Sequence, residues 1–172
     1  MKASNILLII TATTTALMAG LFFSYSISVS LGLGKLNDKE FLNAMQNINR
    51  EIQNIPFFIC FFGTLIMIPI TSFLHYKKQS FLLLIIATVF YSLGVFAVTV
   101  FVNVPLNNKL DLLDLASSSN ASARQMRNIF EDRWNFWNNI RSLSSLCSVF
   151  FVILACVYDG HKRKKELMLN IK

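Results

Sequence analysis

Residues 81–102 read FLLLIIATVFYSLGVFAVTVFV, an apolar run without a single Lys, Arg, Asp or Glu. A helix of roughly 20 apolar residues is long enough to cross the ~30 Å hydrocarbon core of a bilayer. A charged side chain at the centre of that core is energetically expensive, so charges are rare inside spans. The length and composition of this run therefore predict a membrane-spanning helix.

Three further uncharged apolar runs, at residues 6–33, 56–75 and 142–158, flank this one. The first two are long enough to span, and the last is expected to extend upstream as helix. The chain of 172 residues is 54% hydrophobic and only 15% charged, which excludes an ordinary soluble domain. These features predict an all-α membrane protein: one domain, residues 1–172, with four transmembrane helices in a bundle.

The basic residues predict the topology of this bundle. Lys77 and Lys78 occupy the short turn between the second and third spans, and residues 162–165 form a basic run in the tail, residues 159–172. Basic clusters next to spans stay in the cytoplasm. We therefore expect a multi-pass plasma (inner) membrane protein with both termini cytoplasmic and with outer loops at residues 34–54 and 103–140. The basic residues that give the net charge of +7 are then expected to attract anionic lipid of the bilayer, and no nucleic-acid partner is expected.

The first outer loop carries the signature of an amphipathic helix. Asn37 and Glu40 have the spacing of a capping box, and Phe41 and Met45 begin an apolar series at helical intervals. This pattern predicts a helix lying on the outer membrane surface.

The second outer loop predicts two helices. Asn103 precedes Pro105 as a cap would, so a short separate helix is expected after the third span. Ser122, with Gln125 three residues on, is expected to cap a helix that runs without interruption into the fourth span.

Small residues recur every four positions along the first span, at Ala12, Ala16, Gly20, Ser24 and Ser28. Such a stripe lets a neighbouring backbone approach closely. We expect it to pack inside the bundle, with a homo-oligomer interface as the alternative.

The sequence predicts neither a metal site nor a redox pair of cysteines. The two histidines stand at the cytoplasmic boundary without metal-ligand spacing, and His75 is interpreted as an interfacial anchor. The three cysteines all lie in spans and form no Cys-x-x-Cys pair. Small apolar packing is therefore the interpretation preferred for them.

Polar residues gather on the outer side. Thirteen of fifteen asparagines lie in residues 37–54 or 103–139. One helix face is expected to carry Arg127, Glu131, Trp134, Asn138 and Arg141, at steps of four and three residues.

Two interpretations of this face are open. In one it is a membrane-interface belt, with tryptophans at headgroup depth and the arginine reaching to phosphate. In the other it lines a cup between the helix ends, aromatic-walled and rich in amide and guanidinium donors, which suits a flat hydrophobic ligand carrying oxygens. The asparagines favour the cup, because a belt does not require them.

These residues resemble the anthrone oxygenase-like family of small membrane proteins, long catalogued as a domain of unknown function. The resemblance covers roughly residues 5–160. It is carried by the segments AGLFFSY at residues 19–25, AMQNIN at residues 44–49 and NVPLN at residues 103–107, and by the pattern WxxWNxxR at residues 134–141. It implies a four-helix membrane bundle. In the fungal members with a known function, it implies oxidation of an anthrone by dioxygen to an anthraquinone.

Oxidation of this kind is feasible without a cofactor, and none is expected. An anthrone that loses a ring-methylene proton gives a delocalised oxyanion, so the protein needs a base and oriented donors in a site shielded from water. Residue type and location suggest Arg141, Asn138, Asn103 and Asn107 as donors, Glu131 as the base with Tyr25 behind it, and Trp134 and Trp137 as walls. Two alternatives stay open: a non-catalytic binder of a small hydrophobic aromatic or a lipid, and a structural subunit of a membrane complex.

Overall fold

A computed structural model describes residues 3–169, with side chains described for residues 4–160, and every element in this range is helical. The elements in chain order are α1 (Ala3–Ser24), η1 (Tyr25–Val29), α2 (Ser30–Leu33), α3 (Asp38–Glu51), α4 (Ile55–Leu74), α5 (Ser80–Val89), η2 (Phe90–Ala97), η3 (Thr99–Asn103), α6 (Val104–Asp111) and α7 (Asn120–Leu169). Segments η1 to η3 are π-helical, with backbone hydrogen bonds five residues apart.

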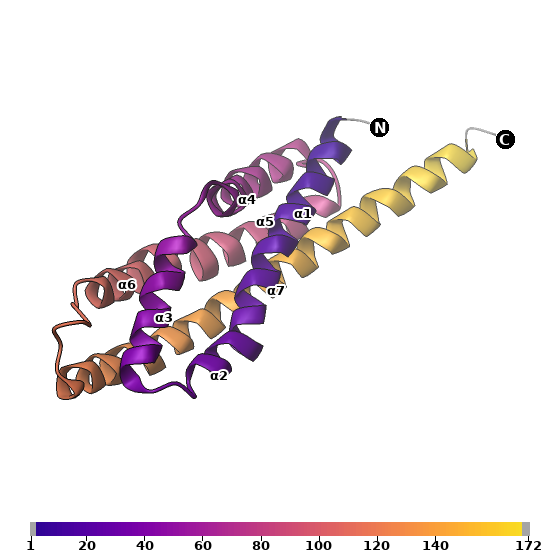
Figure 1. Cartoon of the computed structure of the whole chain (residues 1–172). Coiled ribbons are helices and arrows are strands. Elements are labelled where there is room, and N and C mark those ends of the chain that lie inside the picture. Colours follow the sequence, from indigo (N-terminus) through magenta and orange to yellow (C-terminus); the bar gives the residue numbers. More distant parts are fainter. Residues whose placement is uncertain (1–2, 170–172) are drawn as a thin grey trace.

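Four helical stretches are long and apolar enough to cross a membrane, and they pack as a bundle. The main contacts pair α1 with α7, α7 with α5, α5 with α4, and α4 with α1, which closes a ring. Both ends of the chain lie at the same end of this bundle (Figure 1). The predicted all-α architecture is confirmed, with spans within Ser4–Leu33, Ile55–Leu74, Ser80–Asp111 and Asn120–Gly160.

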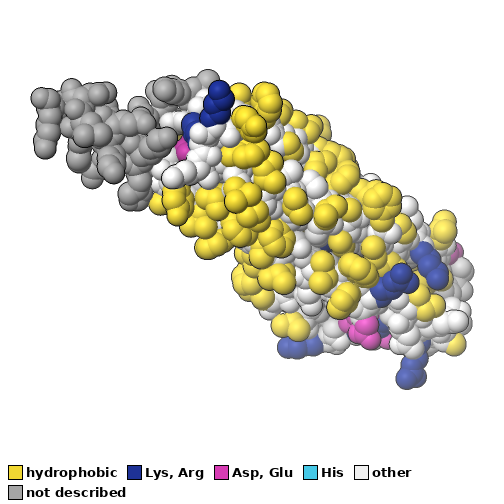
Figure 2. All heavy atoms as spheres, turned by 180° about the vertical axis from the view of Figure 1, so that it is seen from behind, with side chains coloured by type: hydrophobic (Ala, Val, Ile, Leu, Met, Phe, Trp, Pro, Cys, Tyr) yellow, Lys and Arg dark blue, Asp and Glu magenta, His cyan; other side chains and the backbone are white. Residues whose placement is uncertain are grey.

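The surface of the bundle is that of an integral membrane protein. Figure 2 shows hydrophobic side chains spread over the middle of the molecule, with charged side chains gathered towards its ends. Large apolar residues such as Phe73, Leu93 and Phe101 are 65–78% exposed, which suits contact with lipid. An apolar cluster around the fully buried Tyr91 and Leu84 lies inside the bundle, together with buried hydroxyls such as those of Thr64 and Ser148.

Helix α3 packs on protein, and its apolar face is not laid on the membrane surface. The capping box is present as predicted: Asn37 Oδ1 accepts from the Glu40 amide at 3.0 Å, and Glu40 accepts from the Asn37 amide at 3.4 Å. However, Phe41, Leu42 and Met45 are buried in a cluster with residues of α6 and α7. Helix α3 therefore covers the end of the bundle opposite the termini (Figure 1).

The prediction that the third span ends at a cap on Asn103 is wrong. The side chain of Asn103 makes no capping bond, and the helix continues through η3 into α6. Pro105 has no N–H and would clash with the carbonyl four residues back in a regular helix. The π-helical turns just before Pro105 are wider than α-helical turns, and they coincide with this missing backbone hydrogen bond. The start of α7 was also misplaced by sequence reasoning, because Ser119, and not Ser122, accepts the capping bond.

The small-residue stripe of the first span does not pack inside the bundle. Ala16, Gly20, Ser24 and Ser28 are exposed, and a Cβ added at Gly20 would meet nothing within 4 Å. The close helix contact lies elsewhere, at Gly94 in η2, where a Cβ would collide with the side chain of Ser144 in α7.

His75 is buried and is not an interfacial anchor. Its Nδ1 lies 2.7 Å from the Thr71 carbonyl oxygen, and its Nε2 lies 3.0 Å from Oδ2 of Asp159 in α7. The same carboxylate accepts from Lys78 Nζ and Ser80 Oγ, both at 2.8 Å. We call His75, Lys78, Ser80 and Asp159 the Asp159 cluster; it joins α4, α5 and α7 at the end of the bundle that holds the termini.

Candidate functional site

A buried arginine, Arg141, lies in the half of the bundle that α3 covers. Helix α7 places Trp134, Asn138 and Arg141 on one face, as their spacing predicts. All three are almost completely buried, and Arg141 is only 6% exposed. Arg141 is thus enclosed by the other helices, which opposes the belt interpretation of an arginine reaching out to lipid.

The guanidinium of Arg141 is held by few and weak polar contacts. Its Nη2 donates to Asn138 Oδ1 at 2.9 Å, and its Nη1 reaches Thr99 Oγ1 at 3.4 Å. Its carbon Cζ lies 4.6 Å from the ring centroid of Phe22 and 5.2 Å from that of Trp134. Cation–π contacts of this kind grow stronger when water is excluded.

The residues that contact Arg141 from the first and third spans, Phe22 and Thr99, lie within one turn of a π-helical segment or inside it. Tyr25 and Ser26 belong to η1, and Thr99 and Asn103 belong to η3. Single π-helical turns inside α-helices occur frequently at functional sites, because they turn side chains away from the regular pattern. We call Phe22, Tyr25, Ser26, Thr99, Asn103, Trp134, Asn138 and Arg141 the Arg141 cluster.

Amide and hydroxyl groups extend the cluster. Asn138 Nδ2 donates to Ser26 Oγ at 2.8 Å, and that hydroxyl also lies 2.7 Å from Ser142 Oγ. Asn103 Nδ2 contacts the Trp134 carbonyl oxygen at 3.5 Å. The amide of Asn138 is therefore fixed with its oxygen toward Arg141.

Two polar atoms of the cluster have no hydrogen-bond partner: Arg141 Nε and Asn103 Oδ1. Among the residues with described side chains, no carboxylate forms an ion pair with Arg141. A buried charge without a counterion is costly, and such an arginine in a membrane protein is a candidate for a function. The cluster offers one donor and one acceptor that a ligand would satisfy.

The rings of Tyr25 and Trp134, together with α3, close the side of the cluster that faces away from the chain termini. The Tyr25 ring lies 4.8 Å from that of Trp134, and the Tyr25 hydroxyl lies 2.7 Å from the sulfur of Met45 in α3. The Trp134 indole donates to Asn107 Oδ1 at 2.8 Å.

Glu131 is engaged elsewhere. Its carboxylate accepts from Arg127 Nε at 2.6 Å, which is the predicted pair one turn apart. Arg127 also donates to the carbonyls of Gly34 and Leu36 and lies 3.2 Å from Asp38. Ten residues separate Glu131 from Arg141, about 15 Å along a helix. The ion pair lies within α7 and orients Arg127, whose bonds to Gly34, Leu36 and Asp38 hold the segment that enters α3.

The structure thus brings together five of the eight residues proposed from sequence. Arg141, Asn138, Asn103, Trp134 and Tyr25 meet in the cluster. Asn107 lies one hydrogen bond away, through the indole of Trp134. Glu131 lies with Arg127, and the half-buried Trp137 packs edge-on against Phe136.

Sequence reasoning missed Phe22, Ser26 and Thr99. Phe22 and Ser26 stand four residues apart in the first span, as Thr99 and Asn103 do in the third. For Thr99, its position one turn before the polar Asn103 in an apolar span was the available signal. In the part of the chain that the structure describes, no group of three or more His, Cys, Asp or Glu is placed to hold a metal.

Comparison with protein families finds one match: a family model described as anthrone oxygenase matches residues 57–151. That range contains Thr99, Asn103, Trp134, Asn138 and Arg141, while the contributions of the first span lie before it. Neither the curated proteins nor the solved structures contain a significant match to the chain.

Proposed function

Since this chain belongs to the anthrone oxygenase family, we propose that its Arg141 cluster binds a flat lipophilic anthrone and promotes its oxidation by dioxygen to a quinone. One observation carries the proposal: Arg141 is 6% exposed, lies against two aromatic rings and has an unpartnered Nε. An anionic, aromatic ligand supplies both the missing charge and a surface for the rings.

The reaction balances without a cofactor. The ring methylene of the anthrone loses one proton, and the resulting oxyanion is oxidised at that carbon by dioxygen. The carbon exchanges two C–H bonds for one C=O bond. One oxygen atom enters the quinone, and the other leaves as water with the two hydrogens.

Arg141 and Asn138 are assigned to the oxyanion in this proposal. Donors that point in advance at the atom where charge develops lower the barrier most effectively in a site without water. Arg141 brings its free Nε–H, while Asn138 orients the guanidinium through the 2.9 Å bond to Nη2. Asn103 Oδ1 accepts from a hydroxyl of the ligand.

Neither Glu131 nor Tyr25 is assigned as the acceptor of the ring-methylene proton. Glu131 is bound to Arg127 and is remote from Arg141 along α7. Tyr25 is nearer, because its ring contacts the same indole as Arg141. We therefore assign Tyr25 as a wall of the ligand site. The proton lost from the methylene ends in the water that forms, and Glu131 serves to orient Arg127.

The test is oxygen uptake and quinone absorbance with an anthrone and the detergent-purified protein. Arg141→Lys keeps the charge but loses the planar fork of donors, so we expect the rate to fall by about 10- to 100-fold in a folded protein. Asn138→Leu is expected to lose about as much. Lys109→Gln, a change at an exposed site in α6, is the matched control.

Quinone binding is measured separately, by quenching of tryptophan fluorescence in Trp137→Phe, which retains Trp134. Wild-type activity in both Arg141→Lys and Asn138→Leu contradicts the proposal. Quinone binding without oxygen uptake identifies the chain as a non-catalytic binder of the same class of ligand.

A second candidate role rests on the exposed stripe of α1. Ala16, Gly20 and Ser24 present a smooth helix face to the surroundings, which favours docking of another helix. We propose a second copy of the chain as the occupant, with a subunit of another membrane protein as the alternative. Crosslinking in membranes with and without Gly20→Leu distinguishes a docked face from one that contacts lipid only.

The orientation is proposed from charge. Lys77 and Lys78 lie at the same end as both termini, so this end is assigned to the cytoplasm and the Arg141 cluster to the outer half. Labelling of a cysteine introduced at Ser118, from outside only, is the expected result. Labelling from inside contradicts the assignment.

A further inference from the structure

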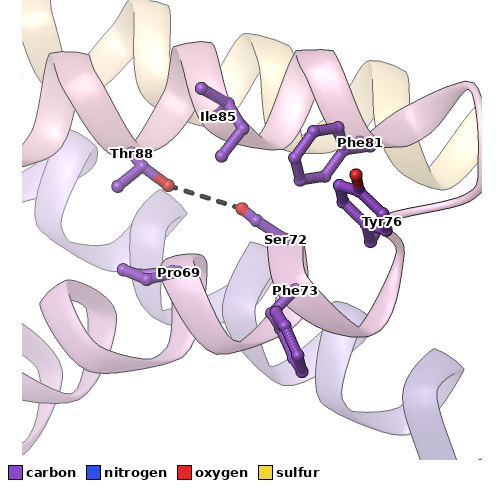
Figure 3. A pocket seen from close by; sticks show the side chains of 7 residues that line it. All are labelled: Pro69, Ser72, Phe73, Tyr76, Phe81, Ile85 and Thr88. Carbon is purple, nitrogen blue, oxygen red and sulfur yellow. Dashed lines mark hydrogen bonds between the residues drawn. The ribbon is translucent and has the colours of Figure 1, made fainter.

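An apolar groove lies between α4 and α5, at the opposite end of the bundle from the Arg141 cluster. It has a volume of about 420 Å³ and is lined by Pro69, Ser72, Phe73, Tyr76, Phe81, Ile85 and Thr88. Figure 3 shows its two walls: Pro69, Ser72 and Phe73 come from α4, and Phe81, Ile85 and Thr88 come from α5.

The floor of the groove is apolar although it contains two hydroxyls. Ser72 Oγ donates to the Ile68 carbonyl and Thr88 Oγ1 to the Leu84 carbonyl, each at 2.8 Å. The two hydroxyls are also 3.5 Å apart (Figure 3). Both donors are thus used within their own helices, and the groove presents hydrocarbon and aromatic surface to its occupant.

The length of the groove matches one leaflet of a bilayer. It runs from Tyr76, at the turn between the helices, to Thr88. Within α5, the eight steps from Ser80 to Thr88 rise about 12 Å, close to half of the ~30 Å hydrocarbon core. The open wall contains Phe73 and Tyr76, which are 78% and 63% exposed. An acyl chain that enters from the lipid side therefore fits along it.

The mouth of the groove is basic. The turn contains Lys77 and Lys78 and no acidic residue. Lys78 is paired with Asp159 at 2.8 Å, whereas Lys77 is exposed and forms no ion pair with any side chain that the structure describes. A lysine next to the membrane surface attracts anionic headgroups.

We propose that this groove binds one acyl chain of an anionic phospholipid, with its phosphate at Lys77. The inference is independent of the proposed oxidation, because the two sites lie at opposite ends of the bundle. Anionic lipid in this position stabilises the α4–α5 hairpin in its membrane orientation.

The test is native mass spectrometry of the detergent-purified chain, incubated with equal amounts of phosphatidylglycerol and phosphatidylcholine that carry the same acyl chains. We expect one retained phosphatidylglycerol. Ile85→Trp fills the groove and is expected to abolish retention. Leu93→Trp, at a 65% exposed position of the same span outside the groove, is the matched control and retains the lipid.

A second pair of variants tests the headgroup. Lys77→Gln is expected to lower the preference for phosphatidylglycerol about fivefold, while Lys109→Gln at the other end of the span leaves it unchanged. Equal retention of the two lipids by the wild type overturns the proposal, and so does equal retention by Ile85→Trp and Leu93→Trp.

Discussion

The two ends of the bundle each bury charge, and they do so in opposite ways. In the Asp159 cluster the carboxylate accepts from Lys78 Nζ and Ser80 Oγ at 2.8 Å and lies 3.0 Å from His75 Nε2, three groups from the start of α5 and the turn before it. In the Arg141 cluster the guanidinium has one good hydrogen bond, two aromatic faces and an unpartnered Nε. No acidic side chain among those described compensates it.

This difference separates a structural site from a binding site. A buried ion pair with all partners present resists removal of any member, because each loss leaves the others uncompensated. A buried cation that is incompletely matched adds little to stability, but it is ready to receive an anion. The π-helical turns lie beside the Arg141 cluster and not beside the Asp159 cluster, which agrees with this division.

The largest loss of stability is expected from Asp159→Leu. The change leaves the buried His75 and Ser80 and the half-buried Lys78 without their common acceptor. We expect a loss of about 3 kcal/mol, measured as thermal unfolding in detergent. The control is Asp111→Leu, which removes an ion pair to Arg50 whose two side chains are about half exposed, and which is expected to cost at most about 1 kcal/mol. Equal losses would show that the Asp159 cluster is not a structural site.

Gly94→Ala is expected to cost about 1–3 kcal/mol by overpacking. The added Cβ would collide with the side chain of Ser144, so α7 must move away from η2 one turn after Arg141. Ligand binding at the Arg141 cluster should weaken, while the lipid groove between α4 and α5 keeps its occupant. The double variant Gly94→Ala, Ser144→Gly should recover the wild-type melting temperature, and failure to do so contradicts the steric argument.

Glu131→Gln is expected to cost about 1 kcal/mol, since it weakens the bond that orients Arg127 toward the segment before α3. Loss of a general base lowers a rate by about 10²–10⁴-fold. If Glu131 only orients Arg127, oxygen uptake by the variant stays within about tenfold of the wild type, below that range. A larger loss, with normal quinone binding, would restore Glu131 as the base.

Arg141→Leu is expected to change stability least, by about 1 kcal/mol or less in either direction. The loss of the cation–π contacts and of the bond to Asn138 is offset, because a desolvated charge is removed. Quinone binding should nevertheless be abolished. A loss as large as that of Asp159→Leu would mean that Arg141 is structural, and the contrast between the two ends would fail.

Some of the site was predictable because it depends on one helix. The spacing of Trp134, Asn138 and Arg141 places them on one face whatever surrounds them. The same reasoning included Glu131, whose partner Arg127 was also predicted, but it did not show that Arg127 would hold the segment before α3. Phe22 was not predicted, because neither residue type nor local spacing distinguishes it from other lipid-facing or core residues.

The sequence by itself determined the four spans, since a bilayer admits only segments with internally paired backbones and enough apolar length. It also determined the capping box of α3 and the unbroken passage of α7 into the membrane, which are local features. Only the tertiary structure decided which faces are buried. The small-residue stripe of α1 faces outward and His75 faces inward, because side chains in a membrane bundle gain little from burial as such and are placed by specific contacts between helices. For the same reason, only the fold showed that Asp159 has its partners and that Arg141 lacks one.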